Sequence, residues 1–299
     1  MINLSASILA KLKNKSKELN INYQQCLRLF FQEEFLRRLS KSAYAENLIL
    51  KGGMFIYILT GSKSRTTVDI DFMAKQFDNT LDYFDKIINE IIDINTGINE
   101  VVILKASRCV PIAVHREYHG VRSQIIGKIN KVTVSFDVDI GVGDVIYPAP
   151  EKRTIQTQLD GFDIPKIMTY SIESTIAEKL DAILQRLELT GRMKDFYDIF
   201  FLAGIFNFDG SKLCKAIKLT FMNRKTEITH DSLNNIILLE SNNDMKVRWR
   251  YFLKTINEKE LEFSDVIKII NKFLKPVLDS IVLNETIHCM WYAEKLEWE

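Results

Sequence analysis

An α+β fold is predicted for this chain: a mixed β-sheet flanked by helices, followed by a helical bundle. Two observations predict it. Up to about residue 168, apolar runs at strand spacing alternate with amphipathic segments, whereas from Ser171 onward only helical periodicity is convincing. The 299 residues suffice for two domains of ordinary size. We therefore expect a mixed domain over residues 1–168 and a helical domain over residues 169–299.

The composition excludes several classes of protein. Hydrophobic residues make up 46% and charged residues 26%, which is typical of a folded globular chain. The formal net charge is +1, so nucleic acid would have to bind a local patch rather than a generally basic surface. The cysteines form no CxxC pair, which argues against structural zinc and predicts reduced, mostly buried thiols. Because no signal-peptide core or membrane-spanning run is present, we expect a cytoplasmic protein with no membrane contact.

Two helices open the chain. Ser5 is the expected N-cap of the first, and the second covers residues 23–39 with its apolar side chains at helical spacing. The opposite face of the second helix carries Arg28, Arg37, Arg38 and Lys41. Because charge along one helix face is usually solvated, we interpret these residues as surface residues.

The other elements follow in order along the chain. Strands are expected at residues 47–50, 68–73, 101–107, 121–129, 131–141 and 151–159. Helices are expected at residues 54–59, 80–94, 171–189, 194–206 and 265–281. We expect no strand after about residue 170, and we assign no role to residues 206–299 as a whole.

The strand at residues 68–73 carries Asp69 and Asp71. Side chains at positions i and i+2 of a strand share a face, so the two carboxylates would repel each other unless a cation lay between them. Mg²⁺ suits such a pair, because it takes one or two carboxylates plus substrate phosphates. A DxD pair by itself is more often two solvated acids, so its interpretation depends on the residues around it.

Lys51, Gly52 and Gly53 lie upstream, where an apolar strand ends and a helical segment opens. Glycines at such a junction let backbone N–H groups approach a phosphate, and the helix N-terminus adds partial positive charge. Two glycines after a strand are also a common tight turn, so this signal is weak alone.

A second acidic strand alternates apolar residues with Thr133, Ser135, Asp137 and Asp139. A third carboxylate delivered from this strand would complete a site for phosphoryl-group transfer, as a base for the attacking hydroxyl or as a metal ligand. An exposed strand face is the alternative, and the pattern alone does not choose between Asp137 and Asp139.

The helical half offers Lys179, Asp195 and Asp198. A lysine can neutralise charge on a triphosphate as a compact point charge. On a helix it is more often the partner of a carboxylate one turn away, and Asp195 could equally cap its helix.

Two further patterns remain. Residues 245–254 combine basic and aromatic side chains, which suits phosphate contact and base stacking, although we favour an amphipathic helix with a buried aromatic face. His115 and His119 have a spacing that binds zinc on a helix. Because Pro111 and Gly120 flank them and favour a loop, we expect no metal site there.

Five sequence blocks, taken in order, resemble the AbiEii/AbiGii toxin family of nucleotidyltransferases, the toxin half of type IV toxin–antitoxin and abortive-infection systems. The blocks are the N-terminal helices running into LILKGGMF, then RTTVDIDF, DVDIGVGD, SIESTIAEKLDAI and GRMKDFYDI. That family resembles the DNA polymerase β superfamily, whose active site combines a Gly-Gly or Gly-Ser turn, a DxD strand and a third acidic strand. The resemblance therefore implies a polymerase β-like nucleotidyltransferase domain followed by the helical domain.

The resemblance also implies roles for the matching residues of the mixed domain. Asp69 and Asp71 would bind Mg²⁺, and Asp139 would be the third acid and a further metal ligand, with Asp137 the alternative. The nucleotide and its phosphates would be contacted by Lys51, Gly52, Gly53, Ser64 and Arg65.

In the helical domain the resemblance implies that Lys179 contacts the nucleotide and that Asp195 is a later essential acid, with the cleft between the two halves. The implied reaction is Mg²⁺-dependent transfer from an NTP, with GTP or a pyrimidine NTP as candidates, to RNA, with tRNA the leading acceptor. Growth arrest would follow, as a defence against phage, and an antitoxin encoded nearby would act without a stable complex. The alternatives are a nucleotide-binding protein without transferase activity, and a transferase that modifies a protein or a small molecule.

Overall fold

The computed structural model describes residues 4–61, 63–77, 80–112, 120–189, 191–229, 231–258 and 260–299. His115 and His119 lie outside these ranges. The chain divides into two compact units, one of residues 1–143 and 150–170, the other of residues 144–149 and 171–299. In the described ranges, no helix combines the length and the apolar character that a membrane span requires.

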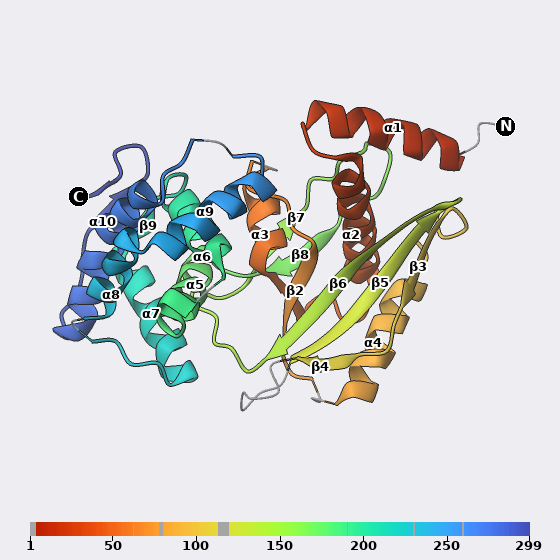
Figure 1. Cartoon of the computed structure of the whole chain (residues 1–299). Coiled ribbons are helices and arrows are strands. Elements are labelled where there is room, and N and C mark those ends of the chain that lie inside the picture. The colour runs from red at the N-terminus through yellow and green to blue at the C-terminus, as the bar shows by residue number, and fades with distance from the viewer. Residues whose placement is uncertain are drawn as a thin grey trace. The chain divides into compact units, whose positions relative to one another are not determined.

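An eight-stranded mixed sheet forms the first unit (Figure 1). Its strands are β1 Leu48–Lys51, β2 Asp69–Ala74, β3 Val102–Ala106, β4 Val110–Ile112, β5 Gly120–Ile129, β6 Val132–Val142, β7 Glu151–Thr154 and β8 Lys166–Thr169. Their order is β3-β5-β6-β2-β1-β8-β7, with β4 paired to β5. Strand β2 runs parallel to β6, and β1 parallel to β8, while the other pairs are antiparallel. The α+β prediction is confirmed, although β4 and β8 were not expected.

Four helices accompany the sheet: α1 Leu4–Glu18, α2 Tyr23–Lys41, α3 Gly52–Leu59 and α4 Leu81–Asp93. Asn22 begins α2 with a capping box, because its side chain accepts from the Gln25 N–H while Gln25 reaches back. Thr80 caps α4 with a single bond, in which its side chain accepts from the Tyr83 N–H. Ser5 does not precede the first helix as expected but lies within α1.

The core of the first unit lies between α2 and one face of the sheet. The Phe35 ring of α2 packs 6.2 Å from the Phe72 ring of β2 and 6.4 Å from the Phe136 ring of β6. Phe31 lies against the bare backbone of Gly127 on β5, where a Cβ would have no room. The residues that alternate with the aspartates of β2 and β6 therefore face α2, and the aspartates face the other way.

The prediction that the charged residues of α2 are solvated is wrong for Arg37 and Arg38, which are 1% and 2% exposed. Both pair with the buried Glu34, at 2.5 Å and 2.8 Å. The Arg37 guanidinium also lies over the Phe30 and Phe162 rings, and Arg38 donates to backbone carbonyls at the ends of α4 and β3. The rest of the unit covers this side of the helix at Arg37 and Arg38, and both guanidinium groups are paired with the carboxylate of Glu34.

The second unit consists of helices and a small sheet. The helices are α5 Ile172–Leu184, α6 Met193–Ala203, α7 Gly210–Arg224, α8 Ser232–Leu238, α9 Asn243–Thr255 and α10 Phe263–Val282, with short 3₁₀ turns at Leu187–Leu189 and Leu239–Ser241. Strands β9 Phe208–Asp209, β10 Met290–Tyr292 and β11 Glu297–Trp298 form a sheet in the order β11-β10-β9. The expectation of no strand in this half is therefore wrong. Strands of two or three residues are too short to show the alternation that would predict them.

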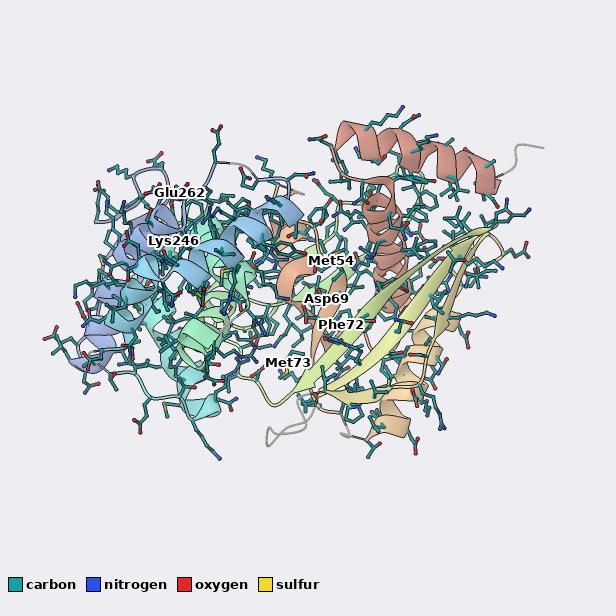
Figure 2. All side chains as sticks on the ribbon, in the orientation of Figure 1. Met54, Asp69, Phe72, Met73, Lys246 and Glu262 are labelled. Carbon is teal, nitrogen blue, oxygen red and sulfur yellow. The ribbon has the colours of Figure 1, made fainter. Side chains whose placement is uncertain are left out.

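The basic and aromatic segment forms α9, on which Figure 2 labels Lys246. Trp249 is buried and its indole N–H donates to the Leu261 carbonyl, while the Phe252 ring lies 5.7 Å from that of Tyr197. The favoured interpretation, a helix with a buried aromatic face, is confirmed for Trp249; Tyr251 is 73% exposed. All four cysteines are free thiols, three of them buried, as predicted.

Candidate active site

Strand pairing places the acidic residues of β2 and β6 side by side. In the parallel register Asp69 lies opposite Asp137, and Asp71 opposite Asp139. Since residues opposite each other on neighbouring strands share a face, four carboxylates gather in a two-by-two block. The sequence predicts that each pair shares a face; the juxtaposition of the two pairs comes from the sheet.

Two cationic residues continue one row of this block. Lys51 on β1 lies opposite Asp71, and Arg122 on β5 lies opposite Asp139. The row Lys51, Asp71, Asp139, Arg122 thus crosses four neighbouring strands. All four residues are half-buried, whereas their apolar neighbours on the strands are fully buried on the other face. Figure 2 labels Asp69 and Phe72, two β2 residues that belong to the opposite faces.

The glycine turn is shaped around Asp71. Gly52 has a φ of +67°, which glycine adopts without strain, and it begins α3. A Cβ at this position would lie 2.7 Å from Cγ of Asp71 and closer still to its carboxylate oxygen Oδ2. A Cβ at Gly53 would lie 2.9 Å from Oγ1 of Thr67 and 3.5 Å from Nη2 of Arg65. Neither position has room for a side chain, because Asp71 of the acidic strand lies against Gly52 and Thr67 of the preceding loop lies against Gly53.

Thr67 holds Asp69 in place. Its hydroxyl donates to Oδ1 of Asp69 at 2.6 Å, and Thr67 is 6% exposed. Thr67 is not among the residues predicted from the sequence, although its hydroxyl two positions before the first DxD aspartate is a local signal. Ser64, predicted to contact the nucleotide, is buried: its N–H donates to Oγ1 of Thr60 and its hydroxyl lies 3.5 Å from the Arg65 carbonyl.

Arg122 is a second site residue that was not predicted from the sequence. Its Nε and Nη2 donate to the two carboxylate oxygens of Asp139, both at 2.7 Å, and its Nη1 lies 3.4 Å from Oδ2 of Asp137. This hydrogen bonding to Asp139 is the main reason that the pKa of Arg122 is raised, against the opposing effect of burial; Asp139, Asp137 and Asp69 add to it through their charges. The guanidinium therefore stays charged beside the acids.

Lys51 occupies the other end of the row. Its ammonium nitrogen lies 5.2 Å from the centre of the Tyr170 ring, within cation–π range. Because β1 and β2 pair in register, the cation and Asp71 stay on neighbouring strands.

The donor set fits a hard divalent cation in part. Across the residues that the structure describes, no group of three or more His, Cys, Asp and Glu side chains is arranged to hold a metal ion. Both carboxylate oxygens of Asp139 accept hydrogen bonds from Arg122. Asp69 and Asp71 remain a two-carboxylate pair on one strand face, which suits Mg²⁺ with phosphate oxygens and waters as its other ligands.

In the second unit, the structure brings Lys179 together with both predicted acids of α6. Its ammonium lies 3.2 Å from Oδ1 of Asp195 and 2.5 Å from Oδ2 of Asp198, and Arg192 donates to Oδ2 of Asp195 at 2.6 Å. Burial raises the pKa of the Asp195 carboxyl, but Lys179 and Arg192 more than offset it, so the pKa lies below its ordinary value. Asp195 is therefore an anion that holds Lys179 in place.

A second ion network lies on the same unit around Arg224. Its guanidinium contacts Asp144, Glu178 and Asp181 at 2.9, 3.3 and 2.9 Å. Asp181 is fully buried and also accepts from the Thr226 hydroxyl. Through Asp144, this network attaches residues 144–149 to the helical unit.

With the geometry established, comparison with known proteins assigns the family. The model of the nucleotidyl transferase AbiEii toxin family, from type IV toxin–antitoxin systems, matches residues 34–269. The chain belongs to this family. No curated protein matches it.

Solved structures agree with the AbiEii assignment at the level of fold. A Helicobacter pylori protein assigned to the nucleotidyltransferases is 14% identical, with a TM-score of 0.53 over 89% of this chain and 100% of that one. JHP933 from Helicobacter pylori is also 14% identical, with a TM-score of 0.51 over 88% and 95%. The predicted family, fold class and nucleotidyltransferase activity are thereby confirmed.

Proposed function

We propose that this AbiEii-family nucleotidyltransferase is the Mg²⁺-dependent toxin of its system and transfers a nucleotide from an NTP to an RNA acceptor. tRNA is the leading acceptor, with GTP or a pyrimidine NTP as donor. The enzyme acts in the cytoplasm, arrests growth as a defence against phage, and is opposed by an antitoxin that forms no stable complex with it. The observation that carries the proposal is the block of four carboxylates on β2 and β6 beside the glycine turn.

Each part of the first unit has a proposed role. Asp69 and Asp71 hold the Mg²⁺, which supplies charge neutralisation on the triphosphate when bound. The backbone of Gly52 and Gly53 lies against the phosphates at the start of α3. Further contacts to the triphosphate come from Lys51, Ser64 and Arg65.

The chemistry that these residues support is an in-line displacement. A hydroxyl of the acceptor attacks the α-phosphorus, a new P–O bond forms, and pyrophosphate leaves with the electrons of the broken bond. Asp139 accepts the proton of the hydroxyl or completes the metal ligands, and Asp137 is the alternative. Positioning and electrostatic stabilisation supply most of the rate in such a reaction.

In the second unit, Lys179 is proposed as a nucleotide contact and Asp195 as the acid that keeps it in place. The support is the ion cluster, in which Lys179 is shared between Asp195 and Asp198. Replacing Lys179 by alanine would leave two buried carboxylates without their shared cation, so stability must be measured beside activity.

One experiment tests the proposal: incubation of the purified chain with Mg²⁺, total RNA or total protein, and each labelled NTP in turn. We expect label in RNA with one NTP, and its loss in Asp69→Asn. Asp160→Asn, which alters an exposed aspartate of the same unit, is the matched control and should keep full activity. Label in protein or in a small molecule would show that the acceptor is not RNA. Binding of nucleotide without transfer from any of the NTPs would refute the proposed reaction.

A further inference from the structure

The pairing between Arg122 and Asp139 has a consequence for metal binding. A bidentate guanidinium occupies the same oxygen atoms that a divalent cation would need from Asp139. The third contact, to Asp137, places the guanidinium beside both acids of β6. In this arrangement β6 presents its carboxylates to Arg122 rather than to the Asp69–Asp71 pair.

Arg122 cannot give up this position by losing its proton, because a guanidinium stays charged in proteins. It can give it up by rotation, since its side chain is 41% exposed while that of Asp139 is 13% exposed. The backbone positions are fixed by the β5–β6 register, which sets Arg122 opposite Asp139. The two states therefore differ in side chains alone.

We propose that Arg122 is an internal counter-ion of the active site, which holds Asp139 and competes with the divalent cation for it. Asp139 joins the cation at Asp69 and Asp71 when Arg122 releases it, and returns to Arg122 when the cation leaves. The inference rests on the proposed function only for the cation at Asp69 and Asp71. Arg122 is a positioning residue that acts through Asp139.

A purely structural ion pair would behave differently. It would stabilise the fold without affecting metal binding, and because Asp139 is only 13% exposed the melting temperature of each Arg122 variant is measured beside its metal affinity. Removal of Arg122 should change how tightly the acids bind a cation, because the competing positive charge is gone. Metal affinity therefore distinguishes the two roles, independently of activity.

The test is titration of the full chain with Mn²⁺, with free Mn²⁺ followed by electron paramagnetic resonance. We expect Arg122→Gln to bind Mn²⁺ about fivefold more tightly than the unaltered chain, a ratio equivalent to about 1 kcal/mol. Arg122→Lys keeps the charge without the bidentate geometry and should fall between the two. In the Asp139→Asn background, Arg122→Gln should have a much smaller effect, because the carboxylate for which the two cations compete is gone and only the charge of Arg122 near Asp137 and Asp69 is removed.

Arg108→Gln is the matched control, since it removes the same charge from an exposed position of the same unit. Equal or weaker binding by a folded Arg122→Gln would overturn the inference, and so would the same gain in Arg108→Gln. If Asp69→Asn weakens binding while Arg122→Gln has no effect, the inference alone fails. If the unaltered chain binds Mn²⁺ no better than Asp69→Asn, the metal site of the proposed function fails with it.

Discussion

Gly52→Ala tests whether the glycine turn exists to accommodate Asp71. Two costs are expected. The φ of +67° is disfavoured for alanine by about 1–2 kcal/mol. The new Cβ would lie 2.7 Å from Cγ of Asp71, whereas ordinary contacts begin at 3.4 Å, so Asp71 must move by at least about 0.7 Å.

That displacement should impair the site more than the fold. Misplacing a catalytic group by about 1 Å can cost about a hundredfold in rate, so a loss of ten- to a hundredfold in nucleotide transfer is expected for Gly52→Ala. Mn²⁺ affinity should fall in parallel, because Asp71 is one of the two proposed ligands. The melting temperature should fall only by the amount that backbone strain accounts for.

Gly97→Ala is the matched control, because Gly97 has a φ of +84° and no atom within 4 Å of the Cβ position. It carries the backbone strain without the overlap, so its activity and Mn²⁺ affinity should stay unchanged while its stability falls by a similar amount. Unchanged metal affinity in Gly52→Ala would refute the reasoning, as would equal losses of affinity in both variants.

Two further predictions concern stability. Burial, partly offset by Arg37, raises the pKa of Glu33 from 4.5 to about 7. The folded state therefore binds the Glu33 proton more tightly than the unfolded state does. As a result, the free energy of unfolding should fall by about 3 kcal/mol as pH rises from 4.5 to 7. Urea unfolding across this range should show Glu33→Gln gaining stability relative to the unaltered chain with rising pH; a constant difference would contradict the assignment. Gly127→Ala should lower the free energy of unfolding by about 1–3 kcal/mol, because its Cβ would lie within 2.7 Å of the Phe31 ring, whereas Gly191→Ala meets open space and should have little effect.

The hairpin that carries Arg122 shows how much of the site could be read from the chain. Both of its strands were predicted, and the observed two-residue turn at Asn130 and Lys131 fixes a register in which Arg122 faces Asp139. If this two-residue turn is assumed, the sequence alone predicts that Arg122 lies opposite Asp139. Thr67 lies two residues before Asp69, so it too is close to the DxD pair in sequence. Both residues are therefore predictable from short segments of the sequence.

Other features had no local signal. Arg37 and Arg38 occupy positions that a helix usually exposes, and their burial depends on α4, β3 and the segment around Phe162. Lys179 meets Asp195 across sixteen residues, which helical spacing within α5 does not predict. Long-range packing decided these contacts, and an apolar pattern within one element carries no information about it.

The sequence by itself determined the α+β class, the strand faces on which Asp69 and Asp71 lie, and the family blocks. It did so because side-chain alternation along a strand, helical periodicity and motif spacing are properties of short segments. The tertiary structure alone decided that β2 lies beside β6 in parallel, which gathers four carboxylates, and that Arg122 occupies one of them. Which strands become neighbours depends on the packing of the whole sheet, and the charge balance of the active site follows from that choice.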